Sequence, residues 1–273
     1  MTAAILAFLF GLLIGSFLNV CIHRWPRDLS VVRPRSHCTA CERTIAWYDN
    51  IPLLSYALLG GRCRYCHAPI SFRYPIVELL TGLEFLYFTQ ALGPGLAAVK
   101  MCAFAAALTG LAFSDWEERI LPDELTLGGA LAGLAFALFV PTPDTTARSI
   151  LWFANVNLEG RADWVVEAAL GAMLPAAILW AGGWLYEKIR HREGLGFGDV
   201  KLMAMVGGFL GLTGALLTVL VGSLLGSILG GGYMLLTRKD STYELPFGTF
   251  LCLAALLAGA VAPNYGEIFF WAR

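Results

Sequence analysis

The sequence is poor in charged residues. Only 14% of its 273 residues are Asp, Glu, Lys or Arg, whereas ordinary soluble domains have about a quarter. Hydrophobic residues make up 58% of the chain, and the mean hydropathy is +0.67. This composition argues against an ordinary soluble protein and predicts an all-α polytopic membrane protein. The formal net charge of -1 points to no particular partner, and we expect no nucleic-acid partner.

The amino terminus lacks the features of a cleaved signal peptide. No basic residue precedes its apolar run, and no clear A-x-A cleavage site follows it. The first positive charges, Arg24 and Arg27, come after the run. We therefore expect residues 4–22 to form a retained membrane anchor.

Apolar runs recur along the chain, and about 20 helical residues are enough to span a bilayer core of about 30 Å. The stretch 200–236 would be about 55 Å long as one helix, so we place a break in "GGFLGLTG" at 207–214. This break puts the basic clusters on one side, which the positive-inside rule makes cytoplasmic. The sequence thus predicts about eight transmembrane helices with both termini outside, near residues 4–22, 76–92, 96–114, 124–140, 164–186, 200–211, 213–236 and 246–263.

A polar, arginine-rich insert separates the first two apolar runs. Its composition predicts a small basic cytoplasmic domain close to anionic lipid. The expected division is a first transmembrane helix at 1–22, the cytoplasmic domain at 23–75 and a membrane core at 76–273. A second insert, at about 141–163, is expected outside the membrane, resting at the interface.

Two cysteine pairs lie in the first insert, "CTAC" and "CRYC", separated by 21 residues. Two C-x2-C pairs can present four thiolates tetrahedrally to one structural Zn²⁺. Two disulfides would fit poorly in a reducing cytoplasm, and iron held by the same thiolates remains an alternative. The other cysteines fall in apolar runs and are expected to be packing residues. The predicted metal ligands are Cys38, Cys41, Cys63 and Cys66; the packing cysteines are Cys21, Cys102 and Cys252.

Three aspartates stand at the ends of apolar runs. Asp115 closes the third run, Asp123 opens the fourth, and Asp199 opens the sixth. The eight-helix topology brings all three to one membrane face, where carboxylates are costly and indicate function. Two carboxylates within hydrogen-bond reach share a proton, so one acts as base and the other as acid. Such a pair can activate water against a peptide carbonyl.

The stretch "GLGFGDVK" at 194–201 leads into Asp199. Gly196 and Gly198, together with Gly194, would leave room for an extended peptide backbone. The stretch lacks G-x-G-x-x-G and follows a helix, which argues against a phosphate loop. Structural alternatives remain open: Asp123 and Asp199 could be helix caps, the latter with Lys201 as its charge partner, and Asp115 could be an interface residue.

These motifs together resemble the type IV prepilin peptidases, bifunctional leader peptidases and N-methyltransferases of pilus assembly and type II secretion. The resemblance covers nearly the whole chain, in order and spacing. It departs at Thr39, where proline is common, and in the length of the 141–163 insert. The segments that carry it are "GSFLNVCIHRWP" (15–26), the cysteine pairs, "WYDNIPLLSYALLGGRCRYCHAPISFRYPIVELLTG" (47–82), "SDWEERILPDELT" (114–126), "GLGFGDVKLMAMVGGFLG" (194–211) and "ELPFGTFL" (244–251).

The resemblance implies a membrane aspartic protease in the bacterial inner membrane, with Asp115 and Asp199 as catalytic residues. Gly196, Gly198 and Lys201 become candidate substrate-positioning residues, and Asp123 a candidate accessory residue. The implied reaction is cytoplasmic cleavage of a short basic leader after glycine, followed by methylation of the new N-terminal residue with S-adenosylmethionine. The implied partners are prepilin or pseudopilin substrates and membrane lipid.

The sequence leaves two other classes of membrane protein as alternatives. Aspartates at helix ends can bind Mg²⁺ and a diphosphate, as in membrane prenyl transferases. Glu117, Glu118, Arg119 and Asp123 would supply part of such a site, but a second acidic cluster around Asp199 is missing. A transporter with intramembrane acids would leave the cysteine pairs unexplained.

Overall fold

The computed structural model describes residues 2–144, 146, 149–150, 158–191, 196–232 and 246–262. The regular elements in these ranges are all helical. Gly194, the basic pair Arg238–Lys239 and, in the outer insert, residues 145, 147–148 and 151–157 lie outside the described residues. In chain order the elements are α1 (Thr2–Arg24), η1 (Trp25–Arg27), η2 (Trp47–Asp49), α2 (Leu54–Leu58), α3 (Arg73–Leu92), α4 (Leu96–Glu118), α5 (Asp123–Ala137), α7 (Arg161–Arg190), α8 (Phe197–Leu225), η3 (Gly226–Gly230) and α10 (Phe247–Val261).

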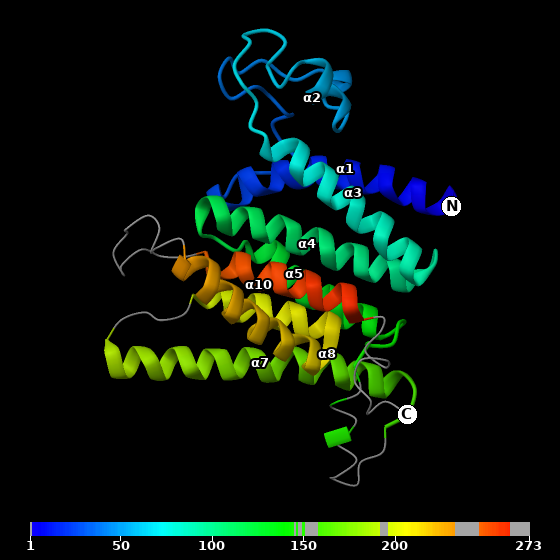
Figure 1. Cartoon of the computed structure of the whole chain (residues 1–273), viewed down its shortest axis with the longest axis vertical. Helices are drawn as coiled ribbons and strands as arrows, with labels where there is room; N and C mark the ends of the chain where they lie inside the picture. Colours follow the sequence, from blue (N-terminus) through cyan, green and yellow to red (C-terminus); the bar gives the residue numbers. More distant parts are fainter. Residues whose placement is uncertain are drawn as a thin grey trace. The chain divides into compact units, whose positions relative to one another are not determined.

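The chain divides into two compact units, Met1–Gly110 and Leu111–Arg273. In the first unit, α1 and α3 pack against each other, and the polar insert connects them (Figure 1). Asn19 on α1 donates a hydrogen bond to the Tyr74 carbonyl at 3.1 Å, which ties the two helices together. Leu53 in the insert donates its backbone N–H to Glu78 Oε2 at 2.8 Å. The insert is therefore attached to α3 by a hydrogen bond as well as by the chain.

In the second unit, α5, α7 and α10 all contact α8. Helix α8 is interrupted at Gly211, whose φ of 81° and ψ of -173° are not helical. In Figure 1 the ribbon of α8 changes direction partway along its length. A positive φ is readily adopted only by glycine, and so this residue fits the interruption. The break predicted within 207–214 is confirmed.

The loop before α7 contributes to the same interruption. The backbone N–H of Thr213 donates to Asp144 Oδ2 at 2.6 Å. This bond satisfies one of the N–H groups left free where the second part of α8 begins. Asp144 therefore acts as a cap from outside the helix, a role that the sequence did not reveal.

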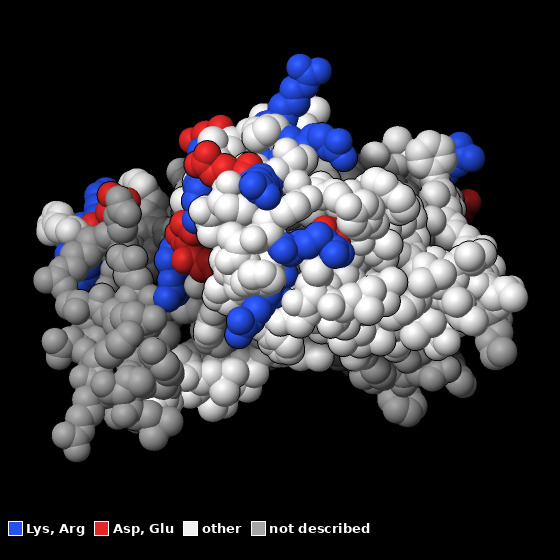
Figure 2. Space-filling model, turned by 90° about the horizontal axis from the view of Figure 1, so that it is seen from above, with Lys and Arg blue, Asp and Glu red and all other residues white. Residues whose placement is uncertain are grey.

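In the described ranges, four helices are long and apolar enough to cross a membrane: Thr2–Arg27, Leu96–Glu118, Arg161–Arg190 and Phe197–Gly230. Large apolar side chains such as Leu6, Leu131 and Leu220 are exposed, and Figure 2 shows a broad surface without charged side chains. In a membrane, lipid would cover these side chains, which explains why the fold leaves them on the protein surface. The all-helical membrane protein is confirmed, whereas the count of eight crossings and the three domain boundaries stay predictions.

Candidate active site and cysteine cluster

Asp115 lies in the last turn of α4 and is buried, with 6% of its surface exposed. The helix ends at Glu118, and the chain turns at Arg119, which has a φ of 59°. Ser114 closes this turn by donating its hydroxyl to the Ile120 carbonyl at 2.7 Å. The turn allows α5 to begin at Asp123, so two helix ends meet in one short segment.

The carboxylate of Asp115 is held by the beginning of α10. Thr249 donates its backbone N–H to Asp115 Oδ2 at 2.6 Å and its hydroxyl to the same oxygen at 2.8 Å. The first turn of α10 has no acidic residue of its own. Asp115 therefore supplies, from another helix, the acceptor that free N–H groups at a helix start require.

Asp199 is the third residue of α8 and is also buried, with 8% exposed. Its backbone N–H donates to the Gly196 carbonyl at 3.1 Å, but its side chain caps nothing. Its charge interacts with that of Asp115. The structure thus places two carboxylates that are 84 positions apart in the sequence close enough for their charges to interact.

The third aspartate, Asp123, forms an ion pair with Lys201, with Nζ at 2.6 Å from Oδ1 and 2.9 Å from Oδ2. The helix start predicted near Asp123 is present, but the side-chain cap is not: Pro122 holds the cap position without a side-chain bond. Lys201 also lies over the Phe197 ring, 4.9 Å from its centroid. Lys201 is therefore paired with Asp123, and Asp199 is neither its partner nor a cap.

The two described glycines of the "GLGFGDVK" stretch have different surroundings. A Cβ on Gly198 would lie 3.2 Å from the Leu121 side chain, a tight contact that would displace one of the two slightly. Among the described residues, a Cβ on Gly196 would meet Asp199 Oδ2 at 3.6 Å, an ordinary contact. Leu121 therefore packs closely against Gly198 but not against Gly196.

The sequence reasoning did not single out Thr249, Gly248 or Leu121. A Cβ on Gly248 would lie 3.1 Å from the Asp115 carboxyl and 3.0 Å from Leu121. The available signal was "LPFGT", a proline followed by glycine and threonine at the start of an apolar run. Cys252, one turn further, is completely buried and interacts with the charges of both aspartates.

The paired cysteines form two similar loops. In the first, the Cys38 carbonyl accepts the N–H of Glu42 at 2.8 Å, and the Cys38 N–H donates to the Arg43 carbonyl at 2.9 Å. In the second, the Cys63 carbonyl accepts the N–H of His67 at 3.0 Å, and the Cys63 N–H donates to the Ala68 carbonyl at 2.9 Å. The residue after each second cysteine has a positive φ, 58° in both loops. Each C-x2-C pair therefore forms the same local turn.

The four sulfurs fit a tetrahedral metal site. All four lie within 4.8 Å of one another, and the Cys38 and Cys66 sulfurs are 3.8 Å apart. A tetrahedron with Zn–S bonds of about 2.3 Å has sulfurs about 3.8 Å apart. Backbone N–H groups of Cys66 and Tyr65 donate to the Cys63 sulfur and lower the pKa of that thiol to about 6, which favours the ligating thiolate. The predicted four-cysteine cluster is confirmed.

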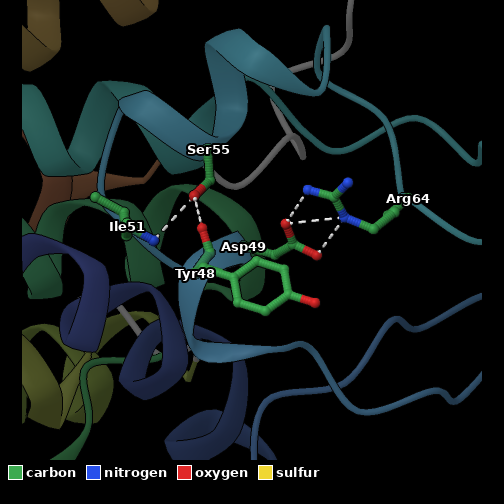
Figure 3. Close-up of polar contacts among 5 residues, drawn as sticks. All are labelled: Tyr48, Asp49, Ile51, Ser55 and Arg64. Carbon is green, nitrogen blue, oxygen red and sulfur yellow. Dashed lines mark hydrogen bonds and ion pairs between the residues drawn. The ribbon is translucent and has the colours of Figure 1, made fainter.

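A bidentate ion pair supports the second cysteine loop. Figure 3 shows the Arg64 guanidinium reaching both carboxylate oxygens of Asp49, with Nε at 2.8 Å and 3.0 Å and Nη2 at 2.6 Å. Arg64 holds the pKa of Asp49 below its ordinary value by this bonding. Ser55 accepts the Ile51 N–H and donates to the Tyr48 carbonyl, which fixes the neighbouring turn. The loop that carries Cys63 is thereby joined to the segment before α2.

Carboxylates do not form a comparable cluster in the described ranges. Among the described residues, one group of three or more His, Cys, Asp or Glu side chains is arranged to hold a metal ion. This group consists of the four cysteines. The acidic ligand set that a Mg²⁺-diphosphate site needs is not assembled around Asp123 or Asp199 in that part of the chain. The geometry therefore favours a pair of interacting acids over a metal-dependent diphosphate site.

Comparison with known proteins agrees with this geometry. The model described as "Bacterial Peptidase A24 N-terminal domain" matches residues 9–92, and that of the "Type IV leader peptidase family" matches residues 102–231. The chain is 36% identical to the prepilin leader peptidase/N-methyltransferase of Aeromonas hydrophila, over 93% of this chain and 89% of the relative. It is 39% identical to the protein of that name from Myxococcus xanthus, over 90% and 69%.

A third relative with this name, from Pseudomonas aeruginosa, is 33% identical over 92% of this chain and 87% of its own length. No solved structure matches the chain. The two family models cover the cysteine loops and both interacting aspartates, so the similarity extends over both candidate sites. The chain therefore belongs to the type IV leader peptidase family, and it is a membrane enzyme.

Proposed function

We propose that this enzyme removes the short basic leader from type IV prepilins or related pseudopilins, with Asp115 and Asp199 as the catalytic pair. The observation that carries the proposal is that these two buried carboxylates stand at the ends of α4 and α8, close enough for their charges to interact. The names of the relatives supply the substrate class. Because both aspartates stand at helix ends, the scissile bond is drawn to the membrane surface. We place this surface on the cytoplasmic side of the inner membrane.

The chemistry of the pair is general acid–base catalysis. Two interacting carboxylates do not both ionise readily, so at neutral pH they share one proton. The ionised member takes a proton from water as the water oxygen attacks the peptide carbonyl, and the protonated member donates to the carbonyl oxygen. No covalent intermediate with the enzyme is needed. The substrate backbone would pass beside Gly196, where an added Cβ makes only an ordinary contact with the described residues.

The cysteine cluster has a structural role in this proposal. Cys38, Cys41, Cys63 and Cys66 would hold one Zn²⁺ with all four coordination positions filled, leaving none for water or substrate. A bound Zn²⁺ supplies folding free energy to a small domain with little apolar core of its own. Such a domain would hold its arginines close to the membrane, where they attract anionic lipid and substrate.

The second activity is methylation of the N-terminal residue that cleavage exposes. The names of the relatives combine leader peptidase with N-methyltransferase. S-adenosylmethionine is the methyl donor in this proposal. The order of the two reactions follows from the chemistry, because the amine that receives the methyl group exists only after the leader is removed.

The decisive experiment uses a synthetic prepilin peptide and the full-length enzyme in detergent or lipid. Mass spectrometry follows loss of the leader, and addition of S-adenosylmethionine reveals a mass gain of one methyl group. Asp115→Asn and Asp199→Asn keep the side-chain size and remove titration, so each should lower cleavage at least about 100-fold.

Asp163→Asn is the matched control, because Asp163 lies in the first turn of α7 and has no part in the proposed pair. It should cleave at the wild-type rate. Wild-type cleavage by either Asp115→Asn or Asp199→Asn would refute the catalytic assignment. Cleavage without methyl transfer in the presence of S-adenosylmethionine would refute only the second activity.

A further inference from the structure

The two aspartates of the candidate pair differ in their hydrogen-bond donors. Asp115 Oδ2 accepts two hydrogen bonds from Thr249, at 2.6 Å from the backbone nitrogen and 2.8 Å from the hydroxyl. The Asp199 carboxyl accepts none from the described residues. Hydrogen bonds to a carboxylate favour its ionised form, so this difference is chemically important for a pair that shares one proton.

Two further features favour negative charge on Asp115. The Thr249 N–H belongs to the first turn of α10, where the free N–H groups carry a partial positive charge. Arg119, just beyond the end of α4, also interacts favourably with the Asp115 charge. Among the described residues, Asp199 interacts with the charge of Asp115, and the buried Cys252 thiol interacts with the charges of both aspartates. The cation named here, Arg119, acts on Asp115.

We propose that Asp115 is the ionised base of the resting enzyme, that Asp199 carries the shared proton and acts as the acid, and that Thr249 is the positioning residue that fixes this division. The proposal rests on the proposed function and deepens it. Both Thr249 bonds go to the same oxygen, Oδ2. The other oxygen, Oδ1, is left to receive the proton from water.

The proton balance of the reaction follows from this division. Asp115 takes one proton from water, the water oxygen bonds to the peptide carbon, and Asp199 gives its proton to the carbonyl oxygen. As the C–N bond breaks, Asp115 returns its proton to the leaving amine, and Asp199 recovers a proton from a hydroxyl of the intermediate. Both aspartates end in the state in which they started.

Thr249 can accommodate both states of Asp115. Its hydroxyl oxygen lies 2.8 Å from Asp115 Oδ2 and 3.1 Å from the Ala112 carbonyl oxygen. A hydroxyl has one hydrogen to donate, so it donates to Asp115 while that carboxylate is charged. When Asp115 has taken the proton, the Ala112 carbonyl is a second acceptor within reach. The backbone N–H stays directed at Oδ2 throughout and keeps the side chain in place.

The first test is the pH profile of cleavage in Thr249→Val, which removes the hydroxyl, and in Thr249→Ser, which retains it. Loss of a hydrogen bond to a charged group makes ionisation of Asp115 harder. The acid limb of kcat/KM should therefore move upward by about one pH unit in Thr249→Val, with about a tenfold loss below the limb. Thr249→Ser should restore the wild-type limb, and the basic limb should stay in place.

Thr218→Val is the matched control. Thr218 is a buried threonine whose hydroxyl donates to the Gly214 carbonyl of its own helix at 2.8 Å. Its pH limbs should coincide with those of the wild type. An unchanged profile in Thr249→Val with a uniformly lower rate would show a merely structural role and overturn the proposal. A shift of the basic limb alone would overturn it as well.

The second test reads protonation directly and needs no substrate. In infrared spectra at pH 7, Asp199→Asn should lose the band of one protonated carboxyl relative to the wild type, whereas Asp115→Asn should lose none. The reverse pattern would overturn the division of roles. Failure of the proposed function would give a different result from failure of this division of roles. Asp115→Asn or Asp199→Asn would then cleave at the wild-type rate, whatever the infrared bands show.

Discussion

The cysteine cluster and the aspartate pair are assembled in different ways. Each cysteine loop is closed by backbone hydrogen bonds between residues four or five positions apart. Asp115 is held instead by Thr249, 134 positions later, and its partner Asp199 comes from a third helix. Local spacing therefore builds the cysteine loops, whereas the aspartate pair depends on the packing of α4, α8 and α10. Changes to the two regions should consequently have different signatures.

The largest effect is expected from removing a metal ligand. Cys63→Ala should lower bound zinc from about one equivalent to near zero, because three thiolates bind far more weakly than four. Limited proteolysis should then cut between residues 25 and 72 while the second unit stays protected. Cys102→Ala is the control, since Cys102 is buried in α4. Zinc retained in Cys63→Ala, or lost in the control, would contradict the assignment.

The next effect concerns the packing around Asp115. A methyl group at Gly248 would press on both Leu121 and the Asp115 carboxyl. Gly248→Ala should therefore lower kcat for leader cleavage about 10- to 100-fold, because small displacements of a catalytic group are costly. At Gly128, inside α5, an added Cβ would meet nothing within 4 Å among the described residues. Gly128→Ala should stay within about threefold of wild type, and an equal loss at Gly248 and Gly128 would contradict this packing argument.

A smaller effect is expected from the Asp123–Lys201 ion pair. Its side chains are 57% and 21% exposed, respectively, and such pairs contribute about 0.2–1 kcal/mol to stability. Lys201→Met and Asp123→Asn should each lower the thermal midpoint slightly and cleavage less than about tenfold. The double variant should be no worse than either single variant, because one substitution already breaks the pair. Additive losses in a double-mutant cycle would show that the two residues act separately.

The smallest effect concerns pH and the Asp49–Arg64 pair. Bonding to Arg64 lowers the pKa of Asp49 in the folded protein. The stabilisation is therefore present above the unfolded pKa and is lost as the pH falls through the lower, folded value. Protease resistance of residues 25–72 should fall more between pH 5 and pH 3 in the wild type than in Asp49→Asn. Identical acid profiles would show that the pair contributes nothing measurable.

Much of the architecture could be predicted because it depends on local pattern. Apolar runs longer than a bilayer crossing indicate helices wherever they occur, and the break in 207–214 was visible as a glycine-rich interruption. The cysteine spacing predicted the four-sulfur cluster. In each case the relevant residues are close together in the sequence, so no knowledge of the packing between helices was required.

The details of the aspartate site could not be predicted in this way. The sequence suggested that Asp123 caps a helix and that Lys201 accompanies Asp199, but the structure pairs Asp123 with Lys201. The direction of a side chain depends on how α5 and α8 pack, which no local pattern states. Leu121 and Gly248 were missed for the same reason, because their importance lies in what they touch.

The sequence by itself determined a helical membrane enzyme and a four-cysteine cluster, and it singled out Asp115 and Asp199 as the proposed reactive acids. These follow from composition, spacing and motif order, which are properties of the chain before it folds. Only the tertiary structure decided what surrounds each acid. The start of α10 points two donors at Asp115 and none at Asp199. Since hydrogen-bond donors stabilise a carboxylate, this packing makes the two aspartates chemically unequal.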